Sequence, residues 1–137
     1  MTSDEIMVWL INYCNDRGYH LQITDQLSPI TPSVSSSATQ SIMVNSKFHI
    51  KRQIPYQFAH EIHHVEAGDS NILYFTLQKA GIEGAANRAA VEMLVPLYFD
   101  GVDPELARVD NFMDAFAIPG NMRDWCEHDI REFYSLT

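Results

Sequence analysis

The chain has 137 residues, a formal net charge of −9 at pH 7 and a hydrophobic content of 46%. This size and composition predict a single domain over residues 1–137, and no run approaches the ~18 apolar residues of a membrane span. The acidic balance argues against direct binding to nucleic-acid phosphates but is compatible with a basic protein partner. Because no secretory signal pattern is present, we expect a cytoplasmic protein; the composition does not indicate an oligomeric state.

The first half of the chain is predicted to contain one helix and two strands. Residues 3–17 carry an apolar stripe at helical spacing, and Ser3 is the expected N-cap. Residues 19–24 alternate between polar and apolar side chains, which indicates a strand, and residues 42–45 are typical of a second one. Residues 28–41 hold two prolines and six serines, which predict a loop.

The second half is predicted to be mostly helical, after a candidate third strand at residues 72–75. After Pro96 the expected helices cover residues 104–109, 111–117 and 120–134. Cys14 and Cys126 fall on separate predicted helices, and we expect free, buried thiols at both positions. The order of elements predicts an α+β fold with a small sheet and a mostly helical C-terminal part.

The most informative motif is His60-Glu61-Ile62-His63-His64, which fits the pattern His-Glu-x-x-His. At ~100° per residue, positions 60 and 64 of a helix lie about 40° apart. Both imidazoles can therefore bind one divalent metal ion. Glu61 lies beside them, where its carboxylate can accept a proton from a water molecule at the metal. The motif predicts two metal ligands and a general base.

The residues around this motif predict an amphipathic helix with a core face and a site face. Pro55 suits the first turn of this helix, and Gly68 suits its C-terminal end. The core face carries the apolar side chains Ile54, Phe58, Ile62 and Val65. The alternative is that the five-residue pattern arose by chance, which six histidines in the chain make more frequent.

A candidate third ligand lies on the next predicted helix, residues 81–96, which is rich in alanine and expected to end at Pro96. Glu83 and Asn87 share one face of this helix, whereas Glu92 falls on the far side and is expected to be solvated. Catalytic zinc usually has three protein ligands, so we predict Glu83 as the third and Asn87 as the partner that orients one histidine. The alternative is that Glu83 is a solvated residue favoured by the helix dipole.

Together the two motifs resemble those of the ImmA/IrrE family of metallopeptidases, small zincin-like proteins often encoded by phages and other mobile elements. The chain is most similar to the short phage-type members. The resemblance is strongest over residues 53–96 and looser elsewhere. It rests on two stretches, Phe58-Ala59-His60-Glu61-Ile62-His63-His64 and Glu83-x-x-Ala86-Asn87-Arg88-x-Ala90-x-Glu92-Met93-Leu94-Val95-Pro96.

This resemblance implies a compact zincin-like domain with zinc-dependent endopeptidase activity. It implies that His60, His64 and Glu83 are the Zn²⁺ ligands and that Glu61 is the catalytic base. It also implies a partner, because members of the family typically sit beside a helix-turn-helix repressor and some cleave that repressor to induce gene expression. We therefore expect a DNA-binding repressor as the protein substrate.

Two positions depart from the family pattern. His63 stands where the family often has Gly, and Ala85 stands where many members have a second Glu. The second departure leaves Glu83 as the only carboxylate in that first turn.

A peptidase also needs a hydrogen-bond donor that stabilises the oxyanion of the reaction, and the candidates for this donor are Tyr74, Tyr56 and His20. We assign no role to His49 or His128.

Two other classes of function remain open at this stage. The protein could bind a repressor without cutting it, with a mainly structural metal, or it could be the toxin-like partner of an antitoxin. The set of two histidines and one glutamate favours zinc over manganese or iron but is not exclusive to zinc.

Overall fold

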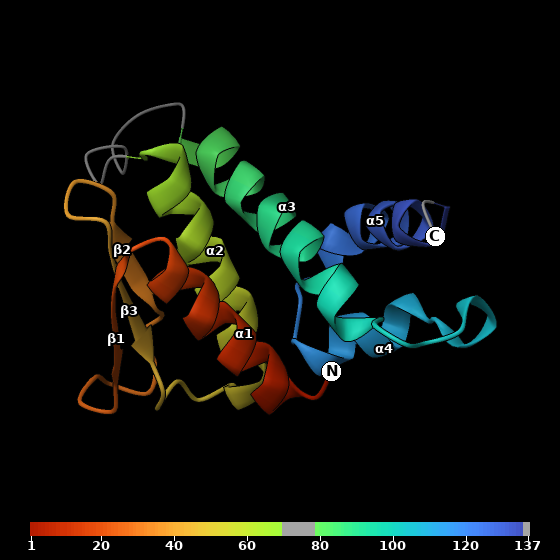
Figure 1. The fold of residues 1–137 in the computed structure, drawn as a ribbon, viewed down its shortest axis with the longest axis horizontal. Helices are drawn as coiled ribbons and strands as arrows, with labels where there is room; N and C mark the ends of the chain where they lie inside the picture. The colour runs from red at the N-terminus through yellow and green to blue at the C-terminus, as the bar shows by residue number, and fades with distance from the viewer. Residues whose placement is uncertain (70–78, 136–137) are drawn as a thin grey trace.

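In the computed structural model, which describes residues 1–69 and 79–135, a small sheet lies at one end of the molecule and helices form the rest (Figure 1). The elements in chain order are α1 (Ser3–Asp16), β1 (His20–Thr24), β2 (Val34–Ser36), β3 (Ser41–Asn45), α2 (Ile54–Ala67), α3 (Lys79–Tyr98), α4 (Val109–Ala115) and α5 (Arg123–Ser135). Short 3₁₀ turns lie at Lys51–Gln53, Pro104–Leu106 and Gly120–Met122. The α+β prediction is confirmed at this coarse level.

The sheet has the strand order β1-β3-β2, with β1 parallel and β2 antiparallel to the central β3. Ile42 and Val44 of β3 are buried, whereas Ser41 and Met43, which alternate with them, are only half-buried. Because side chains alternate along a strand, β3 turns one apolar face towards the helices. The edge strand β2 falls inside the predicted loop, so that prediction is wrong for residues 34–36. Pairing with β3, and not any local apolar alternation, makes this serine-rich segment a strand.

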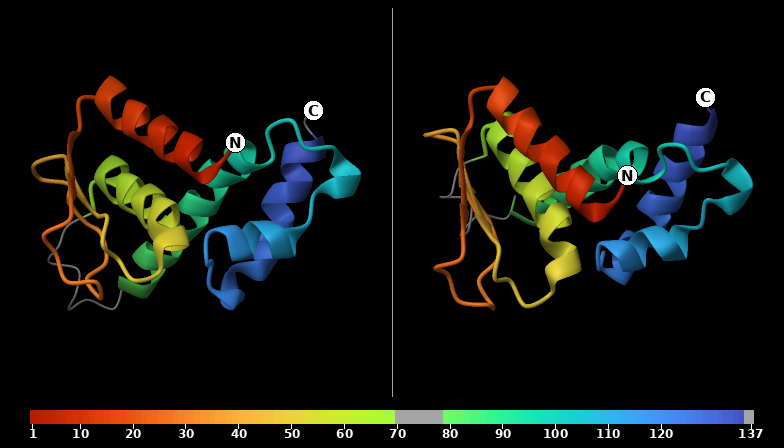
Figure 2. Two further views of the ribbon diagram at one scale, coloured as in Figure 1. Left: turned by 90° about the horizontal axis from the view of Figure 1, so that it is seen from below. Right: turned by 60° about the horizontal axis from the view of Figure 1, so that its bottom comes forward.

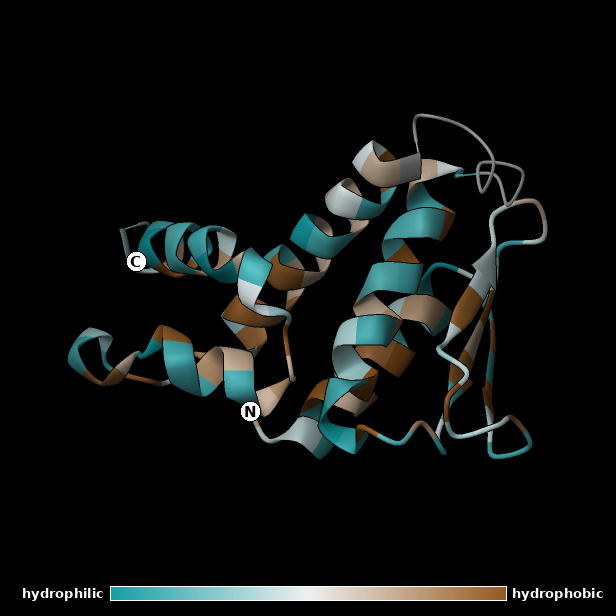
Figure 3. Ribbon diagram, turned by 180° about the vertical axis from the view of Figure 1, so that it is seen from behind, coloured by the Kyte–Doolittle hydropathy of each residue, from teal (hydrophilic) through white to brown (hydrophobic). Residues whose placement is uncertain are grey.

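The helices form layers that begin at the sheet and end at the C-terminus. α1 and α2 pack against the sheet, α3 packs on α2, and α4 and α5 lie on the far side of α3 (Figures 1 and 2). α5 is mainly hydrophilic (Figure 3) and buries only Cys126 and Ile130. Cys14 and Cys126 are both buried free thiols, as predicted.

The ends of α2 agree with the sequence prediction, and its C-terminal end positions part of the site. Gly68 has a φ of 70°, a conformation that glycine adopts without a steric penalty. Its N–H donates to the carbonyl of Val65, and the N–H of Asp69 donates to the carbonyl of His64. These two hydrogen bonds end the helix and fold Asp69 back over its last turn.

α3 does not end at Pro96, as the sequence predicted, but continues to Tyr98. A proline in the last turn removes one backbone donor, and its partner carbonyl would belong to Glu92, which is exposed and open to water. Leu97 and Phe99 are buried in the core, and their packing favours continuation of the helix. Glu92 itself is exposed, as predicted.

Other boundaries also differ from the predictions. The N-cap of α1 is Thr2 and not Ser3, because Thr2 and Glu5 form a capping box. Residues 104–109 form only a 3₁₀ turn at Pro104–Leu106 before α4 begins at Val109. The predicted strand at 72–75 lies outside the described residues. No helix within the described residues is long and apolar enough to cross a membrane.

Candidate metal centre

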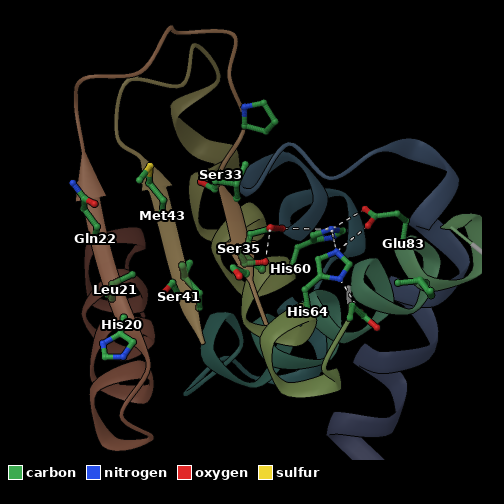
Figure 4. A pocket seen from close by; sticks show the side chains of 17 residues that line it. His20, Leu21, Gln22, Ser33, Ser35, Ser41, Met43, His60, His64 and Glu83 are labelled. Atoms are coloured by element: carbon green, nitrogen blue, oxygen red, sulfur yellow. Dashed lines mark hydrogen bonds and ion pairs between the residues drawn. The ribbon is translucent and has the colours of Figure 1, made fainter. Parts of the chain in front are cut away.

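Three predicted ligands meet where α2 and α3 pack together (Figure 4). Nε2 of His60 lies 3.0 Å from Nε2 of His64 and 3.0 Å from Oε2 of Glu83. Oε1 of Glu83 lies 2.9 Å from Nε2 of His64. Two ligands of a tetrahedral zinc ion, each ~2.0–2.1 Å from the metal, are separated by about 3.3–3.4 Å. The donor atoms are therefore within a few tenths of an ångström of a zinc arrangement.

The partner of His64 determines which of its nitrogens faces this centre. Nδ1 of His64 lies 2.8 Å from Oδ2 of Asp69, and a carboxylate can only accept, so Nδ1 carries the proton. In the neutral ring, Nε2 then presents a lone pair to Nε2 of His60 and to a carboxylate oxygen of Glu83. A cation between these three atoms is the partner that satisfies all of them at once.

His60 also contacts a second residue of α3 besides Glu83. Its side chain forms a hydrogen bond with Asn87, one turn after Glu83, where the sequence had predicted an orienting partner. Burial lowers the pKa of His60, and the neighbouring His64 lowers it further. Both effects favour the neutral imidazole, which is the form that binds a metal ion.

Glu61 lies next to the ligands and is 9% exposed. One of its oxygens, Oε1, accepts a hydrogen bond of 2.9 Å from the hydroxyl of Ser35 on β2. The other, Oε2, lies 3.8 Å from Nε2 of His60. Burial raises the pKa of Glu61 to about 7. A dication held by the neighbouring ligands would favour the carboxylate and lower this pKa.

The centre opens into a cleft of about 940 Å³ that runs from α3 past the edge strand β2 to β1 (Figure 4). The cleft is lined by the metal-centre residues, by serines of β2 and β3, and by a few apolar side chains such as Val34 and Ile82. No Lys or Arg is among its described lining residues. The described lining therefore offers no Lys or Arg side chain to bind a substrate carboxylate.

Of the three candidate oxyanion donors, the structure describes Tyr56 and His20, and it brings neither to the metal centre. Tyr56 is buried in the hydrophobic core and does not line the cleft. That candidate is therefore wrong, because Tyr56 belongs to the hydrophobic core and not to the site. His20 lines the cleft on β1, with β3 and β2 between it and α2 (Figure 4). Tyr74 lies outside the described residues.

The remaining histidines lie outside the cleft lining. The His63 ring is half-buried, with its centroid 6.4 Å from that of His64, so the bulky side chain fits beside the site. His49 is hydrogen-bonded to the carbonyl of Pro29, and His128 contacts the Trp125 ring. None of the three lines the described part of the cleft.

Replacing Tyr56 with Phe is expected to raise the stability of the protein by about 1 kcal/mol, because a buried polar group without a partner is costly. The Tyr56 hydroxyl finds no hydrogen-bond partner among the described residues. Urea denaturation of the two proteins measures the difference. A loss of stability, or a loss of any peptidase activity, would contradict the assignment of Tyr56 to the core.

Sequence reasoning missed two residues of the site, Ser35 and Asp69. Asp69 directly follows Gly68, the glycine that ends α2. A polar side chain at this position could have been predicted to contact a residue in the last turn of the helix, as Asp69 contacts His64. Ser35 lies in a segment predicted as a loop, 26 positions from Glu61, and no local pattern relates the two.

Replacing Asp69 with Ala is expected to lower zinc affinity by about 10–100-fold, the usual cost of losing the carboxylate behind a histidine ligand. The hydrogen bond at 2.8 Å fixes both the tautomer and the ring orientation of His64. Competition with a chromophoric chelator measures the affinity. Asp69→Asn keeps an acceptor and should give an intermediate value, whereas unchanged affinity in both variants would show that Asp69 does not orient His64.

No family model, no curated protein and no solved structure matches the chain in the comparisons with known proteins. The resemblance to a peptidase family therefore rests on the residues of the two motifs and on nothing wider.

Proposed function

We propose that this protein is a zinc-dependent endopeptidase of the ImmA/IrrE type, with a zincin-like fold, that cleaves a helix-turn-helix repressor. The observation that carries the proposal is the meeting of the His60, His64 and Glu83 side chains, with the Glu61 carboxylate beside them. The two Nε2 atoms lie 3.0 Å apart, and each lies about 3 Å from a different oxygen of the Glu83 carboxylate. A metal site with an adjacent, buried carboxylate is the arrangement that metal-assisted hydrolysis requires.

The side chains of the site have distinct roles in the proposed reaction. Zinc, when bound, would act as a Lewis acid that polarises a carbonyl group and makes water more acidic. Asp69 and Asn87 hold the two histidines with their lone pairs towards the centre. Glu61 accepts the proton of the attacking water and then transfers it to the amine that leaves.

The cleft suits an internal segment of a polypeptide. Among the described residues β2 pairs only with β3, so its outer edge can add an extended peptide as a further strand beside the metal centre. Because the described lining contains no Lys or Arg, no such side chain there would pair with the C-terminal carboxylate of a substrate. Cleavage within a chain is therefore favoured over removal of a C-terminal residue.

The charge of the chain suits a basic partner. A net charge of −9 attracts a protein whose surface is positive, as the DNA-binding face of a repressor is. This long-range attraction would increase the rate of encounter without determining which bond is cut.

Incubation of the purified protein with zinc and the repressor encoded beside it tests the proposal. We expect repressor fragments whose termini, read by mass spectrometry, define one internal site, and we expect none after chelation. A stable complex without fragments, formed equally well after chelation, would instead identify a binding protein. Absence of both fragments and complex would contradict the assignment of the repressor as substrate.

A further inference from the structure

The edge strand β2 is attached to the motif helix by polar contacts spaced two residues apart. The backbone N–H of Ser33 donates to Oε1 of Gln57 at 3.0 Å, and the hydroxyl of Ser35 donates to Glu61 at 2.9 Å. After the strand, the hydroxyl of Ser37 donates to the carbonyl of Asp69. Side chains of alternate residues in an extended segment face the same side, so the side that carries the Ser35 and Ser37 hydroxyls faces α2 and its C-terminal end.

The contact of Ser35 differs from the other two because its acceptor is the predicted catalytic base. Glu61 is almost completely buried, and a buried carboxylate needs a hydrogen bond to remain in place. Ser35 supplies that bond to Oε1. Oε2 is left on the side of the metal ligands, 3.8 Å from Nε2 of His60. The two oxygens of one carboxylate thus have separate environments.

We propose that Ser35 is a positioning residue for catalysis: its hydroxyl fixes Oε1 of Glu61 so that Oε2 points to the attacking water. This inference rests on the proposed peptidase function. The last torsion of a glutamate side chain is broad, so the carboxylate plane is poorly fixed by its own rotamer preference. Without Ser35 the carboxylate can rotate, and a small misplacement of a catalytic group lowers the rate.

A merely structural role predicts a different result. If Ser35 only attached β2 to α2, its loss would loosen the edge strand and weaken peptide binding, which raises KM. If Ser35 orients Glu61, its loss lowers kcat and leaves KM and zinc affinity nearly unchanged. Ser46 provides a matched control, since its hydroxyl donates a bond of the same length, 2.9 Å, to the carbonyl of Thr24, and it does not line the cleft.

The experiment measures kcat, KM and zinc affinity for the zinc-loaded wild type, Ser35→Ala, Ser35→Thr and Ser46→Ala. We expect Ser35→Ala to lower kcat by about 10-fold, within the cost of misplacing a catalytic group, with KM and zinc affinity within about twofold. Ser35→Thr retains a hydroxyl and should restore most of kcat, and Ser46→Ala should match the wild type. An unchanged kcat in Ser35→Ala, or a change confined to KM, would overturn the inference.

A second measurement separates this inference from the proposed function. Urea midpoints are compared for Ser35→Ala, Glu61→Ala and the double variant, and for the same set with Ser46→Ala in place of Ser35→Ala. Contact between Ser35 and Glu61 predicts midpoint shifts that do not add, whereas those of Ser46 and Glu61 should add. If the wild type cleaves no substrate, the proposed function fails, and the urea midpoints still test the contact between Ser35 and Glu61. Additive shifts for these two residues would overturn that contact, whereas non-additive shifts would support it.

Discussion

Replacement of Glu61 by Gln is expected to lower the rate of repressor cleavage by roughly 10²–10⁴-fold, the range that a general base contributes. The amide has nearly the shape of the carboxylate and can still accept the hydrogen bond from Ser35, so the cleft should keep its form. It cannot accept the proton of the attacking water at neutral pH. Glu61 is also not one of the three grouped donor residues, and zinc should remain bound.

The measurement pairs a cleavage assay with the zinc content of the same samples. Glu66→Gln is the matched control, because it is the same substitution on the same helix and the amide can still accept the hydrogen bond from Tyr13. We expect this control to cleave at the wild-type rate. Full activity in Glu61→Gln would exclude Glu61 as the base, whereas loss of zinc together with activity would indicate that Glu61 supports the metal site instead.

The parts of the site that the sequence predicts are those determined by helix geometry. His60 and His64 are four residues apart, and on any α-helix that spacing brings two side chains to one face. The same periodicity places Glu83 and Asn87 on one face of the next helix. Only the packing of α2 against α3 had to be supplied by tertiary structure, and the structure does bring the four side chains together.

The parts that the sequence does not predict depend on contacts between distant segments. β2 has no apolar alternation of its own, and its conformation follows from pairing with β3. The contact between Ser35 and Glu61 exists only once that register is formed. A one-residue shift of β2 would turn Ser35 to the other face of the sheet. The continuation of α3 past Pro96 likewise follows from the burial of Leu97 and not from local propensity.

Zinc is expected to stabilise the protein by roughly 4 kcal/mol when free zinc is about 1,000 times its dissociation constant. For a chain of this size, that corresponds to an increase in Tm on the order of 10–20 °C. The physical reason is that the ligand atoms are 2.9–3.0 Å apart in the folded protein and are not held together in the unfolded chain. Differential scanning calorimetry with and without a chelator measures the shift.

Replacing Glu83 with Ala should remove most of this zinc-induced shift while changing the metal-free Tm little. The Glu83 side chain is 43% exposed, so its packing contributes little stability, whereas its carboxylate supplies one of three ligands. Glu92→Ala on the same helix removes an exposed carboxylate outside the site and should keep the full shift. If Glu83→Ala kept the shift as well, the third ligand would lie elsewhere. If zinc did not raise the wild-type Tm, the three side chains would not form a zinc site, and the proposed hydrolytic function would lose its basis.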